Sequence, residues 1–341
     1  MKRGLVEWDP TELSREALAA RVARYQALLA ERGLDAAVFY TSVAQPVAVR
    51  YLTHFLPYWN EGVLVLPRAG EPALFVALSN RVVPWIKGSS TLREVRAARS
   101  LAGDTARYLQ ERGAARIGLV DRGSFPYRLV EELRAQLPAG AWVDLPPLGA
   151  TLPLGQDPDE RRLRRRAGAL AIQALAEVGA TVAGLTDCQL AGRLERALRL
   201  AGAEDTLVLV GPAGQWPGLP RGAPLGERAH VILQVEYKGH WVQLGRTLGG
   251  PPAANGHLAE RLRTWCVPGR RIGAIVDAAQ AHDGTAVYLY RSERGTPFTA
   301  LGAGEQLAVG NIVAVLALHP ARRALYGDTF AVEADGLLAL S

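Results

Sequence analysis

The sequence predicts an α/β first domain followed by an α+β second domain. In the first half, short apolar runs typical of buried strands alternate with amphipathic helical segments. In the second half, helical segments come first and strand-like runs follow in pairs. A Pro- and Gly-rich stretch at 145–158 is expected to link the halves. The 341 residues therefore divide into predicted domains at 1–150 and 157–341, each large enough to bury a core.

The first domain is expected to open with a helix over 13–32, because apolar residues recur there at helical spacing and Gly33 follows as a C-cap. Apolar runs bounded by turn residues predict the strands. The remaining predicted elements are strands at 36–40, 62–67, 72–78 and 116–120, and helices at 101–112 and 127–137.

The second domain is expected to begin with a long alanine-rich helix over 159–182. Thr186 is a candidate N-cap for a helix over 187–200, which Gly202 ends. Asn255 is a candidate N-cap for a later helix. The remaining predicted elements are helices at 256–265 and 272–281, and strands at 206–210, 231–237, 241–248, 286–290, 312–318 and 329–332.

Composition excludes several classes of protein. Hydrophobic residues make up 49% and charged residues 21%, which is ordinary for a globular chain. There is no run of 18 apolar residues and no apolar core of a signal peptide, so we expect a cytoplasmic protein without a membrane partner. Cys188 and Cys266 lack the spacing of a zinc site or a disulfide framework and are expected to be buried thiols.

The net charge of +6 does not predict a nucleic-acid partner. Basic and acidic residues are spread over both halves, and the only basic cluster is the run at 161–166. This run is expected to form a solvated helix face, since neither aromatic interleaving nor a nucleic-acid-binding module accompanies it.

Several phrases, taken in order, resemble the creatinase/aminopeptidase P/prolidase family over nearly the whole chain. The phrases are Arg50-Tyr51-Leu52-Thr53-His54-Phe55, Gly184-Leu185-Thr186-Asp187-Cys188-Gln189-Leu190, Gly239-His240-Trp241-Val242-Gln243-Leu244-Gly245-Arg246-Thr247 and Tyr326-Gly327-Asp328-Thr329-Phe330-Ala331-Val332. The resemblance implies a creatinase-like N-terminal domain and a C-terminal domain of the pita-bread fold. It also implies a homodimer.

Metallopeptidases of this family hold two divalent ions with two Asp, one His and two Glu, and the matched positions here carry other residues. Gln243 matches the second Asp, and Gln234 matches the first if the intervening hairpin is two residues shorter. Leu316 and Gly327 match the two Glu, while Val287 or Tyr288 falls nearest the His. The resemblance therefore implies a lost metal site and no cofactor.

Creatinase itself works without metal, but its chemistry is not supported either. The position that matches its catalytic histidine is Gly218. The acidic side chains expected in the cavity are also absent from positions 316 and 327.

Candidate site residues remain around the cavity that the resemblance implies. Glu236 is a candidate general base if burial raises its pKa, and His240 is a candidate polar contact beside it; each is equally compatible with a place near a hairpin turn. Candidate cavity residues are Gln234, Gln243, Trp216, Arg246, His54 and Arg291, with Glu293 near Arg291 and Trp59 as a second aromatic wall. Core packing, hairpin ordering or surface charge are the alternatives for these side chains.

Three functions follow from these residues. The first is a pseudoenzyme of the Xaa-Pro peptidase family that binds a small amino-acid- or peptide-like ligand, or a protein partner, in the former active-site cavity. The second is a metal-independent C–N hydrolase on the same scaffold. The third is a working Xaa-Pro dipeptidase whose ligands have been misassigned.

Overall fold

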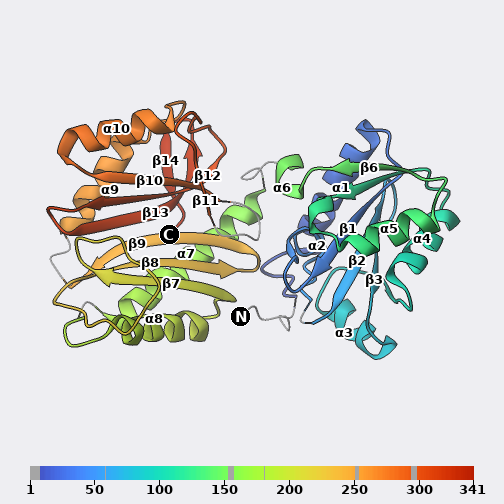
Figure 1. Ribbon diagram of the computed structural model, residues 1–341, viewed down its shortest axis with the longest axis horizontal. Helices are drawn as coiled ribbons and strands as arrows, with labels where there is room; N and C mark the ends of the chain where they lie inside the picture. The colour runs from blue at the N-terminus through green and yellow to red at the C-terminus, as the bar shows by residue number, and fades with distance from the viewer. Residues whose placement is uncertain (1–7, 58, 153–156, 180, 250–252, 293–297) are drawn as a thin grey trace. The chain divides into compact units, whose positions relative to one another are not determined.

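The computed structural model describes residues 8–57, 59–152, 157–179, 181–249, 253–292 and 298–341. The chain divides into two compact units, residues 2–153 and 154–341. The predicted fold class is confirmed: the first unit is a mixed α/β domain, and the second is a curled antiparallel sheet with helices (Figure 1).

The first domain is a six-stranded sheet in the order β4-β3-β2-β1-β5-β6. Strand β1 runs antiparallel to β2 and parallel to β5. The elements are α1 (Arg15–Glu31), β1 (Ala36–Ser42), α2 (Val47–Thr53), β2 (Glu61–Pro67), β3 (Ala73–Val76), η1 (Asn80–Val82), α3 (Val83–Gly88), β4 (Glu94–Ala97), α4 (Leu101–Glu111), β5 (Arg116–Val120), η2 (Arg122–Ser124), α5 (Tyr127–Gln136), β6 (Ala141–Leu145) and α6 (Leu148–Thr151).

The periodic elements of this domain lie where the sequence predicts them, and the short ones were missed. Helices α2, α3 and α6 and strands β4 and β6 have too few residues to show a clear period. Helix α6 and the last residue of β6 lie inside the stretch at 145–158 that was expected to be linker.

The second domain is an eight-stranded sheet, in which seven strands follow the order β11-β10-β12-β13-β9-β8-β7 and β14 pairs with β13. The elements are α7 (Pro158–Val178), α8 (Asp187–Ala201), β7 (Asp205–Pro212), β8 (Ala229–Tyr237), β9 (His240–Leu248), α9 (Ala253–Trp265), α10 (Ile272–Asp283), β10 (Ala286–Arg291), β11 (Thr299–Ala300), β12 (Ile312–His319), β13 (Ala324–Glu333) and β14 (Gly336–Ala339).

Helices cover one face of this sheet. Helices α7 and α8 pack on β7–β9, and α9 and α10 pack on β10, β12 and β13 (Figure 1). The capping box at Thr186 fixes the start of α8, because its hydroxyl accepts from Gln189 N while the Gln189 side chain accepts from Thr186 N. We call the opposite face of the sheet the inner face.

Three sequence expectations differ from the structure. Asn255 lies inside α9, which begins at Ala253, so it is not the N-cap. Cys188 is exposed near the start of α8, whereas Cys266 is buried as expected. Arg164 is fully buried although Arg162, Arg165 and Arg166 of the basic run are exposed. Its guanidinium donates to Trp241 O and Ser292 Oγ, both at 2.8 Å. Among the described residues, no helix is both long and apolar enough to cross a membrane.

Candidate functional site

The inner face can be assigned residue by residue from the strand register. Side chains alternate between the two faces of a strand, and directly paired residues of antiparallel strands share a face. One row of paired residues crosses five strands from β10 to β8: Tyr288, Leu316, Gly327, Gly245 and Ile232. The next row along the strands contains Thr329, Gln243 and Gln234.

The two glutamines form a bonded pair. Gln234 lies directly opposite Gln243, and its Nε2 donates to Gln243 Oε1 at 2.8 Å. Thr329 of β13 fixes the other side of Gln243, because its Oγ1 accepts from Gln243 N at 2.8 Å and donates to Gln243 O at 3.2 Å. The backbone of this row is therefore rigidly placed, and the amide pair lies at its centre.

The buried polar atoms on this face that lack hydrogen-bond partners within the described part of the chain include Gln234 Oε1, an acceptor, and Trp241 Nε1, a donor. Trp241 is two residues from Gln243 and shares its face, and it pairs in register with the fully buried Glu236. A buried polar atom without a partner costs about 1–3 kcal/mol, so this pair of atoms calls for a complementary group.

Leucine fills the row beside the amide pair. Gly327 and Gly245 lie side by side, and the Leu316 side chain packs into the space that their missing side chains leave. A Cβ built on Gly327 would overlap Leu316 Cδ2, and one built on Gly245 would lie 3.0 Å from the same atom. Leu316 is fully buried and belongs to an aliphatic cluster with Ile232, Leu318 and Leu325.

The sheet curls far enough for its two halves to meet. Trp216 follows β7, the last strand at one end of the sheet, yet its ring centroid lies 4.4 Å from that of Tyr288 on β10. The loop that carries Trp216 is held by two hydrogen bonds between Val210 and Gly218. Both rings remain partly exposed, so Trp216 is an aromatic residue at the margin of the inner face.

Arg246 does not share the inner face with Gln243. It lies on the helix-covered face, directly opposite Tyr326, with its guanidinium 4.6 Å from the centre of that ring. The guanidinium donates to Gly245 O and Gly327 O and pairs with Asp328 at 3.3 Å. Burial raises the pKa of Asp328 above its ordinary value, although Arg246 opposes this shift. The structure therefore gives Arg246 a role in ordering strands, not in lining a cavity.

The other candidates are dispersed. His240 pairs with Tyr237 in register, which places it on the face opposite Glu236. His54 is buried in the first domain at the end of α2, with a left-handed φ of 66° and Nδ1 3.3 Å from Ser89 O. Arg291 forms an ion pair with Glu305, and both side chains are about two-fifths exposed. Glu293 lies outside the described residues.

Trp59, the second aromatic candidate, lies in the first domain. It stacks on Trp85 with ring centroids 6.1 Å apart and remains 45% exposed.

The central side chains of the inner face are two neutral amides, a hydroxyl and a leucine, and Gly327 and Gly245 contribute no side chain. The carboxylate of Glu236 lies on the same face, two residues from Gln234. Hard divalent ions prefer several anionic oxygen or imidazole ligands. Among the described residues, no group of three His, Cys, Asp or Glu side chains is placed to hold a metal ion.

His230 is a polar residue of this face that sequence reasoning missed. Its Nε2 accepts from Gly214 N at 2.8 Å, and its Nδ1 lies 3.2 Å from Thr247 Oγ1. Thr247 Oγ1 donates onward to Leu325 O, so Nδ1 carries the proton and the ring is neutral. Burial, with Arg228 and Arg323 nearby, lowers the pKa of His230 to about 4.

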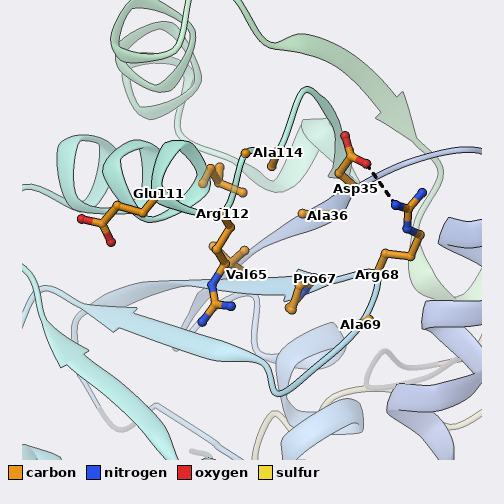
Figure 2. A pocket seen from close by; sticks show the side chains of 11 residues that line it. Asp35, Ala36, Val65, Pro67, Arg68, Ala69, Glu111, Arg112 and Ala114 are labelled. Atoms are coloured by element: carbon orange, nitrogen blue, oxygen red, sulfur yellow. Dashed lines mark ion pairs between the residues drawn. The ribbon is translucent and has the colours of Figure 1, made fainter.

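The first domain contains a separate pocket of about 530 Å³, between the start of β1, the end of β2 and the C-terminus of α4 (Figure 2). Asp35 and Arg68 form an ion pair of 3.6 Å on its wall (Figure 2). Asp35 also accepts from Arg116 N and Ala115 N, which hold the pKa of its carboxyl below the ordinary value. Arg112, on the other side, pairs with Glu94 at 3.6 Å. Both arginines therefore already have carboxylate partners.

Comparison with known proteins identifies the first domain. Residues 21–152 match the family model of the creatinase/prolidase N-terminal domain. The first domain belongs to this family. No curated protein sequence matches the chain.

Solved structures show the same fold over both domains of this creatinase/prolidase-like chain. An X-Pro aminopeptidase from Thermotoga maritima MSB8 aligns with a TM-score of 0.74 at 15% identity, covering 94% of this chain and 97% of that one. A Xaa-Pro dipeptidase from Bacillus anthracis gives 0.71 at 17%, covering 95% and 97%. The dipeptidase PepE from Mycobacterium ulcerans gives 0.67 at 20%, covering 98% and 97%. At these identities the likeness establishes the two-domain pita-bread fold.

Proposed function

We propose that this chain is a homologue of the Xaa-Pro peptidases that has no metal-dependent peptidase activity and binds a small amino-acid- or peptide-like ligand on the inner face. The observation that carries the proposal is the Gln234–Gln243 pair beside the glycine row that Leu316 fills. In this proposal, Gln234, Gln243, Leu316 and Gly327 occupy the former ligand positions.

The charge argument against a dinuclear centre is direct. Two divalent ions carry four positive charges, and neutral amide oxygens compensate none of them. Leu316 moreover occupies the space beside Gly327 and Gly245 with an aliphatic side chain. A charged ion next to that aliphatic cluster would lose hydration without gaining ligands.

The partnerless atoms favour a peptide-like ligand over an aliphatic one. Gln234 Oε1 is an acceptor and Trp241 Nε1 is a donor, and both are buried on the same face. A peptide group presents the complementary set, an N–H and a C=O. A ligand that satisfies both atoms would remove two desolvation penalties at once.

Calorimetry tests the proposal in two titrations of the metal-stripped protein near neutral pH. With Mn²⁺ we expect no tight binding. With glycyl-alanine, whose peptide bond carries both an N–H and a C=O, we expect binding that weakens about tenfold in Gln234→Leu and Trp241→Phe, each of which removes one hydrogen bond to the ligand. Gln280→Ala, on the exposed side of α10, is the matched control. Tight binding of about two Mn²⁺ ions would overturn the proposal and favour a working Xaa-Pro dipeptidase. Dipeptide binding that ignores both variants would remove the inner face as the ligand site.

A metal-independent C–N hydrolase is the second candidate, because Glu236 is a fully buried carboxylate on the same face as Gln234. The register places His240 on the other face, so Glu236 would have to act as general base without it. Turnover of creatine or a dipeptide by metal-free protein, abolished in Glu236→Gln, would favour this candidate.

We also propose a homodimer, as in the family that the sequence resembles. Sedimentation of the purified chain tests this, and a single species of 36.6 kDa would contradict it.

A further inference from the structure

Two arginines from distant parts of the sequence are linked by hydrogen bonds at one end of the second domain. Arg228 precedes β8, and Arg323 lies in the turn between β12 and β13 with a left-handed φ of 50°. Arg228 Nη2 donates to Arg323 O at 2.9 Å, and Arg323 Nε donates to Ala213 O at 2.9 Å. Ala213 N donates to Arg228 O at 3.2 Å, which closes a cycle of three hydrogen bonds.

This cycle orients the Arg323 side chain. Gly214 has a φ of 96°, and a Cβ on it would lie 3.2 Å from Arg323 Cγ, so the aliphatic part of Arg323 packs against this glycine. Only Nε of the guanidinium is used within the described residues; both Nη atoms of this exposed side chain have no protein partner there. The planar fork is therefore fixed at its base and presents its outer N–H groups to solvent.

The two positive charges are not compensated. Neither Arg228 nor Arg323 forms an ion pair with a carboxylate in the part of the chain that the structure describes, whereas Arg161, Arg199 and Arg246 do. Both guanidiniums lower the pKa of the same imidazole, His230, which shows that their fields overlap at one place. Because His230 Nε2 accepts from Gly214 N and its ring is neutral, no third positive charge is added there.

We propose that Arg323, with Arg228 behind it, binds an oxyanion: a phosphate or carboxylate group of a small molecule. A bidentate guanidinium contact suits either group, and the second guanidinium supplies charge without having to be reordered. The site differs from the amide pair on the inner face and does not depend on the function proposed above. Arg322, the preceding residue in the same turn, accepts from Arg228 Nη1 through its backbone O at 3.4 Å, but its side chain is exposed and takes no part in the cycle.

The test is calorimetric titration of the full chain with inorganic phosphate and, separately, with citrate, at constant ionic strength. We expect binding that weakens at least tenfold in Arg323→Gln and Arg228→Gln and less than twofold in Arg322→Gln, the matched control. Arg323→Lys keeps the charge but loses the fork, and we expect it to fall between wild type and Arg323→Gln. Binding of phosphate alone or citrate alone identifies the group, and binding of both supports recognition of the shared oxyanion.

Two outcomes would overturn the proposal. One is no heat of binding with either anion at 10 mM, about the weakest affinity of interest for a specific site. The other is equal weakening by Arg322→Gln and Arg323→Gln, which would indicate a diffuse positive surface. Thermal melting of each variant shows whether a loss of binding reflects unfolding. If Arg228→Gln does not fold, the affinity of Arg323→Lys relative to wild type still tests the guanidinium contact.

Discussion

Leu316→Ala is expected to lower the free energy of unfolding by about 3 kcal/mol, because it empties a fully buried site between two strands. Gly327→Ala is expected to cost about 2 kcal/mol for the opposite reason, since its Cβ would overlap Leu316 Cδ2 and crowd Val315 O at 2.9 Å. Urea unfolding of the full chain, with hydrogen exchange in β12 and β13 as the local measure, gives both values.

The double variant Leu316→Ala/Gly327→Ala decides whether the two residues form one packing unit. We expect its cost to fall short of the sum of the single costs by at least 1 kcal/mol, because shortening Leu316 makes room for the new methyl group. Leu194→Ala combined with Gly327→Ala is the control: Leu194 is equally buried but packs against the helices, so these costs should add. Strict additivity in the first pair would contradict the packing described for the glycine row.

This packing bears on function because the same residues are the proposed former metal-ligand positions. A protein that had merely lost two carboxylates would retain a polar, hydrated hollow there. Leu316 instead closes the hollow with aliphatic contacts, and Tyr288 and Trp216 lie at its margin. The inner face is therefore divided into an apolar part at the glycine row and a polar part at Gln234, Gln243 and Trp241.

The fold was predictable because its signals are local. The capping box at Thr186 and the left-handed Gly202 bound α8 as the sequence predicts. The pairing of Gln234 with Gln243 was accessible for a similar reason: a short hairpin fixes its register, and counting residues gives the partner. Strands β11 and β14 were not predicted, and neither has the run of buried apolar residues that marks the equally short β3.

The side-chain environment was not predictable from the same counting. Arg246 stands in a phrase typical of the family, but its face depends on strand parity and its partners on β13, which is far away in the sequence. That Trp241 Nε1 and Gln234 Oε1 both lack hydrogen-bond partners can be recognised only when the positions of all neighbouring side chains are known. His230 gave no signal, because a single histidine in an apolar strand has no motif and its hydrogen-bond partners come from two other segments.

His230 makes the stability of the second domain depend on acid. Its pKa is about 4 in the folded protein and about 6.5 in an unfolded chain, so between these values the unfolded state binds more protons. The stabilisation is complete above pH 6.5 and is lost as the pH falls toward 4. Linkage gives a loss of about 2 kcal/mol at pH 5 and about 3 kcal/mol at pH 4, relative to neutral pH.

The variant His230→Gln isolates this effect from the carboxylates, which titrate in the same range. Its amide can keep a bond to Gly214 N, and a constant cost of losing the ring is expected at every pH. The free energy of unfolding of the wild type minus that of the variant should therefore fall by about 3 kcal/mol from pH 7.5 to pH 4, because only the wild type has an imidazole to protonate. A difference that stays constant over this range would mean that the pKa of His230 is the same in the folded and unfolded states. Folding would then place no penalty on protonating the ring, contrary to the bond that Nε2 accepts from Gly214 N. The pH dependence of this difference in unfolding free energy therefore tests the hydrogen-bond chain through Gly214, His230 and Thr247.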